Sequence, residues 1–258
     1  MPDTARRKFP GAAEAAFTAD TLLNGKIRLR QPVAGYRAAI DPVFLAAAVP
    51  AGPGDRVLDA GCGAGAAFLC LARRVSGCTV AGVERDAAFA ELARFNVRDN
   101  GFEERVEIHT GDIAGSIPGL APASCDHVMI NPPYLDPRRS RPSVHGSRAA
   151  AMVEGAAGPA AWFSFAHAML RDGGTLTLIH RADRLADVMA ALSPRFGGIE
   201  QFPLFPFSGR AAKRVIFRAR KDSDAPAAML PGLVLHGDDG RFTAAADEIL
   251  RQGRALVF

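Results

Sequence analysis

From Arg56 onward, short runs of β-branched and apolar residues alternate with stretches rich in Ala, Arg and Leu. The apolar runs predict strands at 57–60, 79–84, 106–109, 127–130, 175–180 and 214–219. Helices are predicted between them at about 65–75, 86–99, 159–170 and 183–192. Strand and helix in this rhythm indicate an α/β fold, because parallel strands need crossover connections. We expect a doubly wound, mostly parallel sheet with helices on both faces.

The segments before and after this region have weaker patterns. Residues 1–20 are Ala-rich and polar, and predict a loose arm. Residues 26–30 alternate basic and apolar side chains, which is typical of an exposed strand. Asp41 is a good N-cap and Pro42 suits the first helical position, so a short helix should run to about Val49.

Three parts of the chain are expected. Residues 1–50 form an N-terminal extension that covers a cofactor site, and residues 51–221 form the catalytic domain. Residues 222–258 form a C-terminal extension packed on the same domain, with a helix near 243–251.

The composition, with 48% apolar and 22% charged residues, is that of a soluble globular protein and excludes a disordered or fibrous chain. The cysteines lack CxxC spacing, so we expect buried thiols in a reducing compartment. The longest uncharged stretch, 155–170, is shorter than the ~20 apolar residues of a membrane span. The basic N-terminus has no apolar run of a signal peptide behind it. A cytoplasmic protein is predicted.

The net charge of +4 comes from a chain in which Arg far outnumbers Lys. A compositional bias of the genome explains this as well as a surface for a polyanion does, and the charge alone does not separate the two.

A glycine-rich turn follows the first predicted strand of the alternating region, in the sequence Val-Leu-Asp-Ala-Gly-Cys-Gly-Ala-Gly (57–65). Gly61, Gly63 and Gly65 let the backbone turn sharply and approach a ligand closely. The same glycines with Ala66 also fit the dinucleotide-binding pattern. Asp59, before the first glycine, favours a cationic or hydroxyl-bearing ligand over a pyrophosphate.

Two further acids follow predicted strands. Glu84 is placed to accept hydrogen bonds from both hydroxyls of a ribose, as it would be in a nicotinamide enzyme, or it is an ordinary exposed acid. Asp112 is placed to bind an exocyclic amino group, with Ile113 packing on an adenine ring. A helix-capping role is equally compatible with Asp112.

The sequence Asn131-Pro132-Pro133-Tyr134 directly follows a predicted strand and is the most informative motif for function. The prolines stiffen the loop, so that the Asn131 side chain and the Pro132 carbonyl form two fixed acceptors beside an aromatic ring. This arrangement suits a planar substrate that bears an amino or amide nitrogen. The alternative is a proline turn that merely ends a strand.

Together these motifs resemble the class I S-adenosylmethionine-dependent methyltransferases of the amino-methylating branch, over roughly residues 22–220. Within that branch, the chain is similar to bacterial tRNA adenine-N6 methyltransferases, which modify the adenine just 3′ of the anticodon in a valine tRNA. The segments of this chain that carry the similarity are residues 29–32, 35–37, 40–41, 178–185 and 214 onward.

The resemblance implies a role for each motif. Asp59, Gly61, Gly63, Gly65, Glu84, Asp112, Ile113 and Asn131 would bind S-adenosylmethionine. Glu84 would hold the ribose hydroxyls, Asp112 the cofactor adenine, and Asp59 would order the glycine turn. Asn131 and Pro132 would orient the target amine, and Tyr134 would stack on the flipped base. The rate would come mainly from alignment, with no metal required.

Other residues favour less specific roles. The loop that follows residue 134 contains four arginines, Arg138, Arg139, Arg141 and Arg148. It is either a solvated surface or an RNA contact. The basic segment 209–221 is partly a strand, so only some of its cations can face one ligand. Trp162 and its aromatic neighbours on a predicted helix are expected in the core. His145, His167 and His180 are dispersed, which does not favour a metal site.

The sequence therefore predicts an S-adenosylmethionine-dependent adenine-N6 methyltransferase acting on tRNA. A glutamine methyltransferase of release-factor type shares the 131–134 motif, but residues 1–56 do not form the helical substrate domain of that family. A methyltransferase of another RNA, a non-catalytic RNA adaptor and a nicotinamide oxidoreductase are the remaining alternatives.

Overall fold

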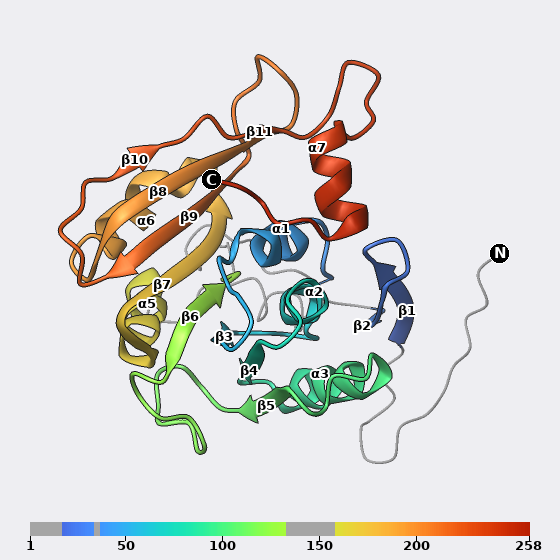
Figure 1. The fold of residues 1–258 in the computed structure, drawn as a ribbon, viewed down its shortest axis with the longest axis vertical. Helices are drawn as coiled ribbons and strands as arrows, with labels where there is room; N and C mark the ends of the chain where they lie inside the picture. Colours follow the sequence, from blue (N-terminus) through green and yellow to red (C-terminus); the bar gives the residue numbers. More distant parts are fainter. Residues whose placement is uncertain (1–16, 34–36, 133–157) are drawn as a thin grey trace, which may run out of the picture.

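The structure is a computed structural model that describes residues 17–33, 37–132 and 158–258 (Figure 1). Its main sheet has the strand order β10-β8-β9-β7-β6-β3-β4-β5, and β11 also pairs with β8. The strands are β3 (Arg56–Ala60), β4 (Thr79–Glu84), β5 (Val106–Thr110), β6 (Cys125–Ile130), β7 (Leu170–Arg181), β8 (Phe196–Phe205), β9 (Arg214–Lys221), β10 (Ala228–Met229) and β11 (Leu233–Val234). Among the described strands of this sheet, only β9 runs antiparallel to its neighbours. The strand order reverses at β3, so the predicted doubly wound sheet is confirmed.

Helices cover both faces of the sheet (Figure 1). One face carries α1 (Asp41–Ala48), α2 (Ala66–Arg74) and α3 (Ala87–Asp99), and the other carries α5 (Gly158–Met169) and α6 (Leu185–Leu192), which follows the short helix η1 (Ala182–Arg184). Successive strand residues enter opposite cores, as Val57 and Leu58 of β3 do. This alternation is the period of two that a strand imposes on its side chains.

β8 lies between β9 and the short strands β10 and β11, and the sequence pattern did not predict it. Gly197, Gly198 and Pro203 interrupt its apolar residues, and glycine and proline are depleted in strands. Gly197 is required by packing, because a Cβ there would lie 1.8 Å from the carbonyl oxygen of Ser223.

A separate hairpin precedes the main sheet, formed by β1 (Phe17–Leu22) and β2 (Ile27–Pro32). The expectation of a loose arm was therefore wrong for residues 17–20, and residues 1–16 lie outside the described residues. In β2 the side chains of Ile27, Leu29 and Gln31 are buried, whereas Arg28 is exposed and Arg30 is half-buried. The predicted alternation is confirmed.

The start of α1 differs from the prediction in one respect. Pro42 is in the first turn as expected, but the N-cap residue is Ile40 and no side chain caps the helix. Asp41 lies inside the first turn, where its carboxylate accepts a hydrogen bond from Nε of Arg214 at 2.7 Å. The aspartate therefore ties α1 to β9 instead of capping the helix.

Two asparagines attach the hairpin to the main domain: Asn96 in α3 and Asn100, the C-cap residue of α3. Asn96 accepts from the Arg30 N–H at 2.9 Å and donates to the Arg30 carbonyl at 3.0 Å. One turn later, Asn100 makes the same pair of bonds with the backbone of Arg28, at 2.9 and 2.7 Å. Four helical residues rise about 6 Å and two strand residues about 6.7 Å, so the two spacings match. Asn96 also donates to the Ala64 carbonyl in the glycine turn at 2.8 Å.

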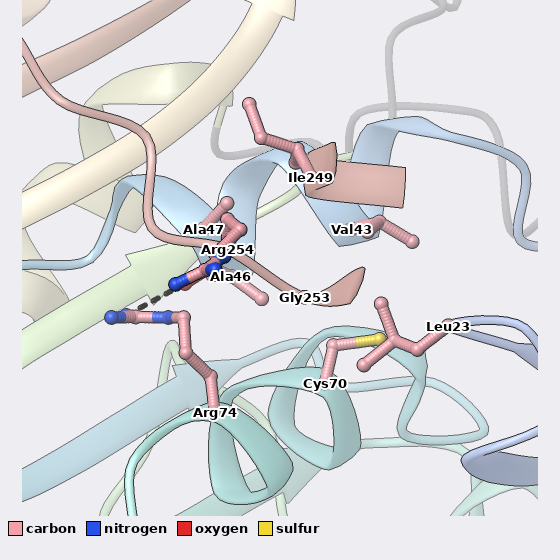
Figure 2. A pocket seen from close by; sticks show the side chains of 9 residues that line it. All are labelled: Leu23, Val43, Ala46, Ala47, Cys70, Arg74, Ile249, Gly253 and Arg254. Atoms are coloured by element: carbon pink, nitrogen blue, oxygen red, sulfur yellow. Dashed lines mark hydrogen bonds between the residues drawn. The ribbon is translucent and has the colours of Figure 1, made fainter. Parts of the chain in front are cut away.

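The C-terminal segment packs on α1. It comprises α7 (Ala244–Asp247) and a π-helical turn, η2 (Glu248–Gln252), where the sequence predicted a helix, and the Leu256 N–H donates to the Ala47 carbonyl at 2.8 Å. A small, mainly apolar pocket lies where this segment, α1, α2 and the hairpin meet (Figure 2). Arg74 at its border donates to the Ala46 carbonyl at 2.9 Å, which satisfies one of the last carbonyls of α1. We interpret the pocket as a packing seam.

No helix in the described ranges combines the length and the apolar character needed to cross a membrane. All four cysteines are buried and free, as expected: Cys62, Cys70, Cys78 and Cys125.

The asparagine pair gives a test of the hairpin attachment. Asn96 is fully buried, so Asn96→Ala leaves backbone groups without partners and should lower the free energy of unfolding by about 2–3 kcal/mol. Asn100→Ala is the matched control, because water reaches the partners of this more exposed residue and the cost should stay below about 1 kcal/mol. Urea unfolding followed by circular dichroism measures both values. Equal costs would show that the buried bonds of Asn96 do not dominate the attachment of the hairpin.

Candidate active site

The carboxyl ends of β5, β4, β3 and β6 lie side by side at one edge of the sheet. The parallel register places Ala60 opposite Ile130, and Glu84 opposite Thr110. The chain continues from these strand ends into the motifs singled out from the sequence, which begin at Gly61, Gly111 and Asn131. The topology thus brings motifs from distant parts of the chain to one edge, at the point where the strand order reverses. Ligands of open α/β sheets bind at this place.

The glycine turn requires its glycines for conformational reasons. Gly61, Gly63 and Gly65 have φ values of +71°, +56° and +99°, in the left-handed region that side chains disfavour. The N–H groups of Gly61 and Cys62 both donate to the Val83 carbonyl at 2.9 Å, which fixes the turn over the end of β4. A Cβ added at Gly63 would meet no atom within 4 Å. The backbone at Gly63 is therefore open to a ligand.

Glu84 is held against this turn. One of its carboxylate oxygens accepts the Gly63 N–H at 3.0 Å, and the other accepts the Asp86 N–H at 2.9 Å. Asp86 in turn caps α3 through the N–H groups of Ala88 and Phe89. A carboxylate has about four acceptor positions, so two remain for hydroxyl donors of a ligand.

Asp59 occupies a contrasting environment at the same turn. Its side chain is buried, and its Oδ2 has no hydrogen-bond partner among the described residues. Burial raises the pKa of Asp59 to about 7; the Phe68 N–H in the first turn of α2 opposes this shift, and the charge of Glu84 adds to it. A buried polar atom without a partner is unusual in a folded protein and marks a site where a ligand is expected.

Asp112 and Ile113 lie beyond the end of β5. The Gly111 N–H donates to the Glu84 carbonyl at 2.9 Å, which brings this loop to the end of β4. Asp112 is exposed and its carboxylate accepts the Ala114 N–H at 2.9 Å, so it stabilises a turn, not a helix N-terminus. Ile113 is half-buried against the core beneath α5 and α6.

Asn131 directly follows β6 and is half-buried, and Pro132 is buried. Together they lie just past the end of β6, the strand that neighbours β3 and its glycine turn. Pro133, Tyr134 and the four arginines of the following loop lie outside the described residues, as do Tyr36 and His145.

Trp162 is a site residue that the sequence pattern did not identify. A Cβ at Gly61 would lie 2.7 Å from Cη2 of Trp162, so the indole lies directly against the glycine turn. Trp162 is half-buried, whereas Phe163 and Phe165 on the same helix are buried as expected. Trp162 packs against the core beneath α5 and α6, so the expectation of a core tryptophan is confirmed in part. Helical periodicity did not show that its indole also reaches the glycine turn. Asn96 was also missed, although an asparagine on the apolar face of α3 was a usable signal.

No group of three or more His, Cys, Asp or Glu side chains that could bind a metal occurs in the described part of the chain. His167 interacts with Asp222 at 2.8 Å. His180 is buried in β7, and burial lowers its pKa to about 4.

The chain is similar to several known proteins over most of its length. A solved structure of a predicted O-methyltransferase from Agrobacterium tumefaciens is 30% identical, with a TM-score of 0.71 over 84% of this chain and 98% of that one. A relative from Actinobacillus succinogenes, named tRNA1(Val) (adenine(37)-N6)-methyltransferase, is 26% identical over 84% of this chain and 89% of its own. A relative of the same name from Yersinia pestis is 37% identical over 39% of this chain and 41% of its own.

These similarities agree with the strand order and confirm the predicted fold class. The family model described as the methyltransferase small domain matches residues 40–202, well over half of the chain. The prediction of a methyltransferase is thereby confirmed, and this chain belongs to the methyltransferase small domain family.

Proposed function

We propose that the chain is a cytoplasmic enzyme that uses S-adenosylmethionine to methylate the exocyclic N6 amine of an adenine in tRNA, 3′ of the anticodon. The observation that carries the proposal is the position of Asn131 and Pro132 beside the glycine turn, on the edge that also bears Glu84. The names of the Actinobacillus and Yersinia relatives support tRNA as the substrate.

The residues of the glycine turn fit S-adenosylmethionine. The open backbone at Gly63 leaves room for a ligand, Glu84 has acceptor positions left for two ribose hydroxyls, and Asp112 lies at the next strand end for an adenine amino group. When bound, this cofactor supplies an electrophilic methyl group on a positively charged sulfur. With a pKa near 7, Asp59 is able to carry the negative charge that favours such a cation.

The target amine is positioned by the loop after β6. The Asn131 side-chain oxygen and the Pro132 carbonyl accept its two N–H groups, which directs its lone pair toward the methyl group. Tyr134 stacks on the base, and the arginines Arg138, Arg139, Arg141 and Arg148 hold phosphates. Alignment supplies most of the rate, and no general base is needed before the transfer, because the nitrogen becomes acidic once it is methylated.

The ribose assignment is tested with Glu84→Ala. Loss of a charged acceptor costs ~1.5–3 kcal/mol per hydrogen bond, so affinity for S-adenosylhomocysteine should fall at least tenfold. Trp162 is the only tryptophan of the chain and lies against Gly61, so its fluorescence should change on binding and report the affinity. Glu107→Ala, at an exposed acid of β5, is the control. Unchanged affinity in the Glu84 variant would exclude this residue as the ribose ligand.

The amine-positioning role is tested with Asn131→Ala. Turnover should be abolished while the affinity for S-adenosylhomocysteine stays close to that of the wild type, since the main effect is on the target amine. Single-turnover methyl transfer and Trp162 fluorescence measure the two properties separately. A fully active variant would rule out the proposed mechanism.

The substrate class is tested by methyl transfer from labelled cofactor to unfractionated tRNA and, in parallel, to a glutamine-containing release-factor peptide. We expect labelled tRNA, with N6-methyladenosine as the product in nucleoside mass spectrometry. Methylation of the peptide at glutamine, with tRNA unlabelled, would identify the chain as a protein methyltransferase instead.

A further inference from the structure

The edge that carries the candidate active site continues past β6 to β7, β9 and β8. Because β9 is antiparallel to both neighbours, its first residue, Arg214, lies opposite Arg181 at the end of β7 and Leu204 near the end of β8. The loop 206–213 that joins β8 to β9 is therefore on the same edge as the end of β6 (Figure 1), which Asn131 directly follows. It joins the ends of β9 and β8, which lie two and three strands from β6, or about 10–14 Å at ~4.8 Å per strand.

Three of the six cations of the basic segment 209–221 have partners. Arg214 pairs with Asp41 at 2.7 Å, and Arg218 pairs with Glu200 at 2.7 Å. Lys221 donates to the Leu170 carbonyl at 2.8 Å. Arg220 is exposed, but it lies at the opposite end of β9.

Arg210 and Lys213 are the remaining cations of the segment 209–221. Both are exposed, and neither side chain has a hydrogen bond or an ion pair with the residues that the structure describes. The loop 206–213 contains no acidic residue. It thus presents two available cations on the edge that carries the candidate active site.

An aromatic side chain accompanies these cations. Phe207 is 42% exposed, and its ring centroid lies 5.3 Å from that of His236, which in turn lies 4.7 Å from Phe242. The His236 Nδ1 and backbone N–H are 2.9 and 3.1 Å from the Pro206 carbonyl, so the stack is fixed to the start of the loop. Phe207 is the exposed end of this supported stack.

We propose that the loop 206–213 is a docking surface for the tRNA substrate, on which an unpaired base stacks on Phe207 and phosphates bind Arg210 and Lys213. This inference rests on the proposed function and extends it to a second contact region. An exposed aromatic face beside available cations is the chemistry that binds single-stranded nucleic acid. The separation from Asn131 is that of a few nucleotides, so flanking residues of the methylated loop can reach the surface while the target base is in the site.

The test compares two variants with two matched controls. Phe207→Ala removes the stacking ring, and the double variant Arg210→Glu/Lys213→Glu reverses both cations. Met229→Ala removes another exposed apolar side chain. Arg98→Glu/Arg220→Glu makes the same charge change at exposed arginines near the C-terminal ends of α3 and β9, away from this edge.

Binding of tRNA is measured by fluorescence anisotropy over a range of salt concentrations, and S-adenosylhomocysteine binding by Trp162 fluorescence. Phe207→Ala should weaken tRNA binding about tenfold, which is within the range for loss of one base stack. Reversal of Arg210 and Lys213 should flatten the slope of log Kd against log salt by about 1.4–1.8, as expected for two phosphate contacts. For both variants, the KM for tRNA should rise. The kcat at saturating tRNA and the affinity for S-adenosylhomocysteine should stay unchanged.

Unchanged tRNA affinity and salt slope in both loop variants, or equal losses in the controls, would overturn the docking surface. That result is distinct from failure of the proposed function, in which the wild-type chain itself transfers no methyl group to tRNA. If the wild type methylates tRNA and the loop variants do so with the same KM, only the docking surface is wrong.

Discussion

The parallel register of β5, β4, β3 and β6 is the constraint on which the site depends. Side chains alternate between the two faces of each strand, so a slip of one residue would exchange the two cores and also separate the strand ends. The hydrogen bonds from the turn to the Val83 carbonyl and from Gly63 to Glu84 exist only in this register. The backbone ladder that holds the sheet together therefore also sets the geometry of the site.

Two carboxylates at the same turn have different environments, and this difference gives each a separate use. Glu84 accepts two backbone N–H groups, which hold it as a fixed acceptor at the strand end. Asp59 is buried with one unpaired oxygen, and its raised pKa reflects the cost of holding a charge there. A cationic ligand offsets that cost, whereas a neutral one does not. The turn is thus suited to a ligand that combines hydroxyl groups with a positive charge.

Local patterns predicted most of the elements that position the site. Apolar runs identified β3 to β6, and the motifs at their ends lie on one edge because the strands are parallel. The prediction failed where tertiary contacts decide the structure. β8 contains glycines and a proline that only its neighbours explain, and Asp41 bonds to Arg214, which is distant in the sequence. Trp162 and Asn96 reach the glycine turn through helix packing, which spacing along the chain does not show.

The pair formed by Asn96 of α3 and the C-cap residue Asn100 has a consequence for the behaviour of the chain in solution. A strand at the edge of a small sheet exposes unpaired N–H and C=O groups, which can recruit a strand from another molecule. In β2, the backbone groups of Arg28 and Arg30 that do not face β1 are occupied by the amides of Asn100 and Asn96. The helix thus substitutes for a third strand without extending the sheet. It closes one side of the hairpin to the edge-to-edge association that begins many aggregates.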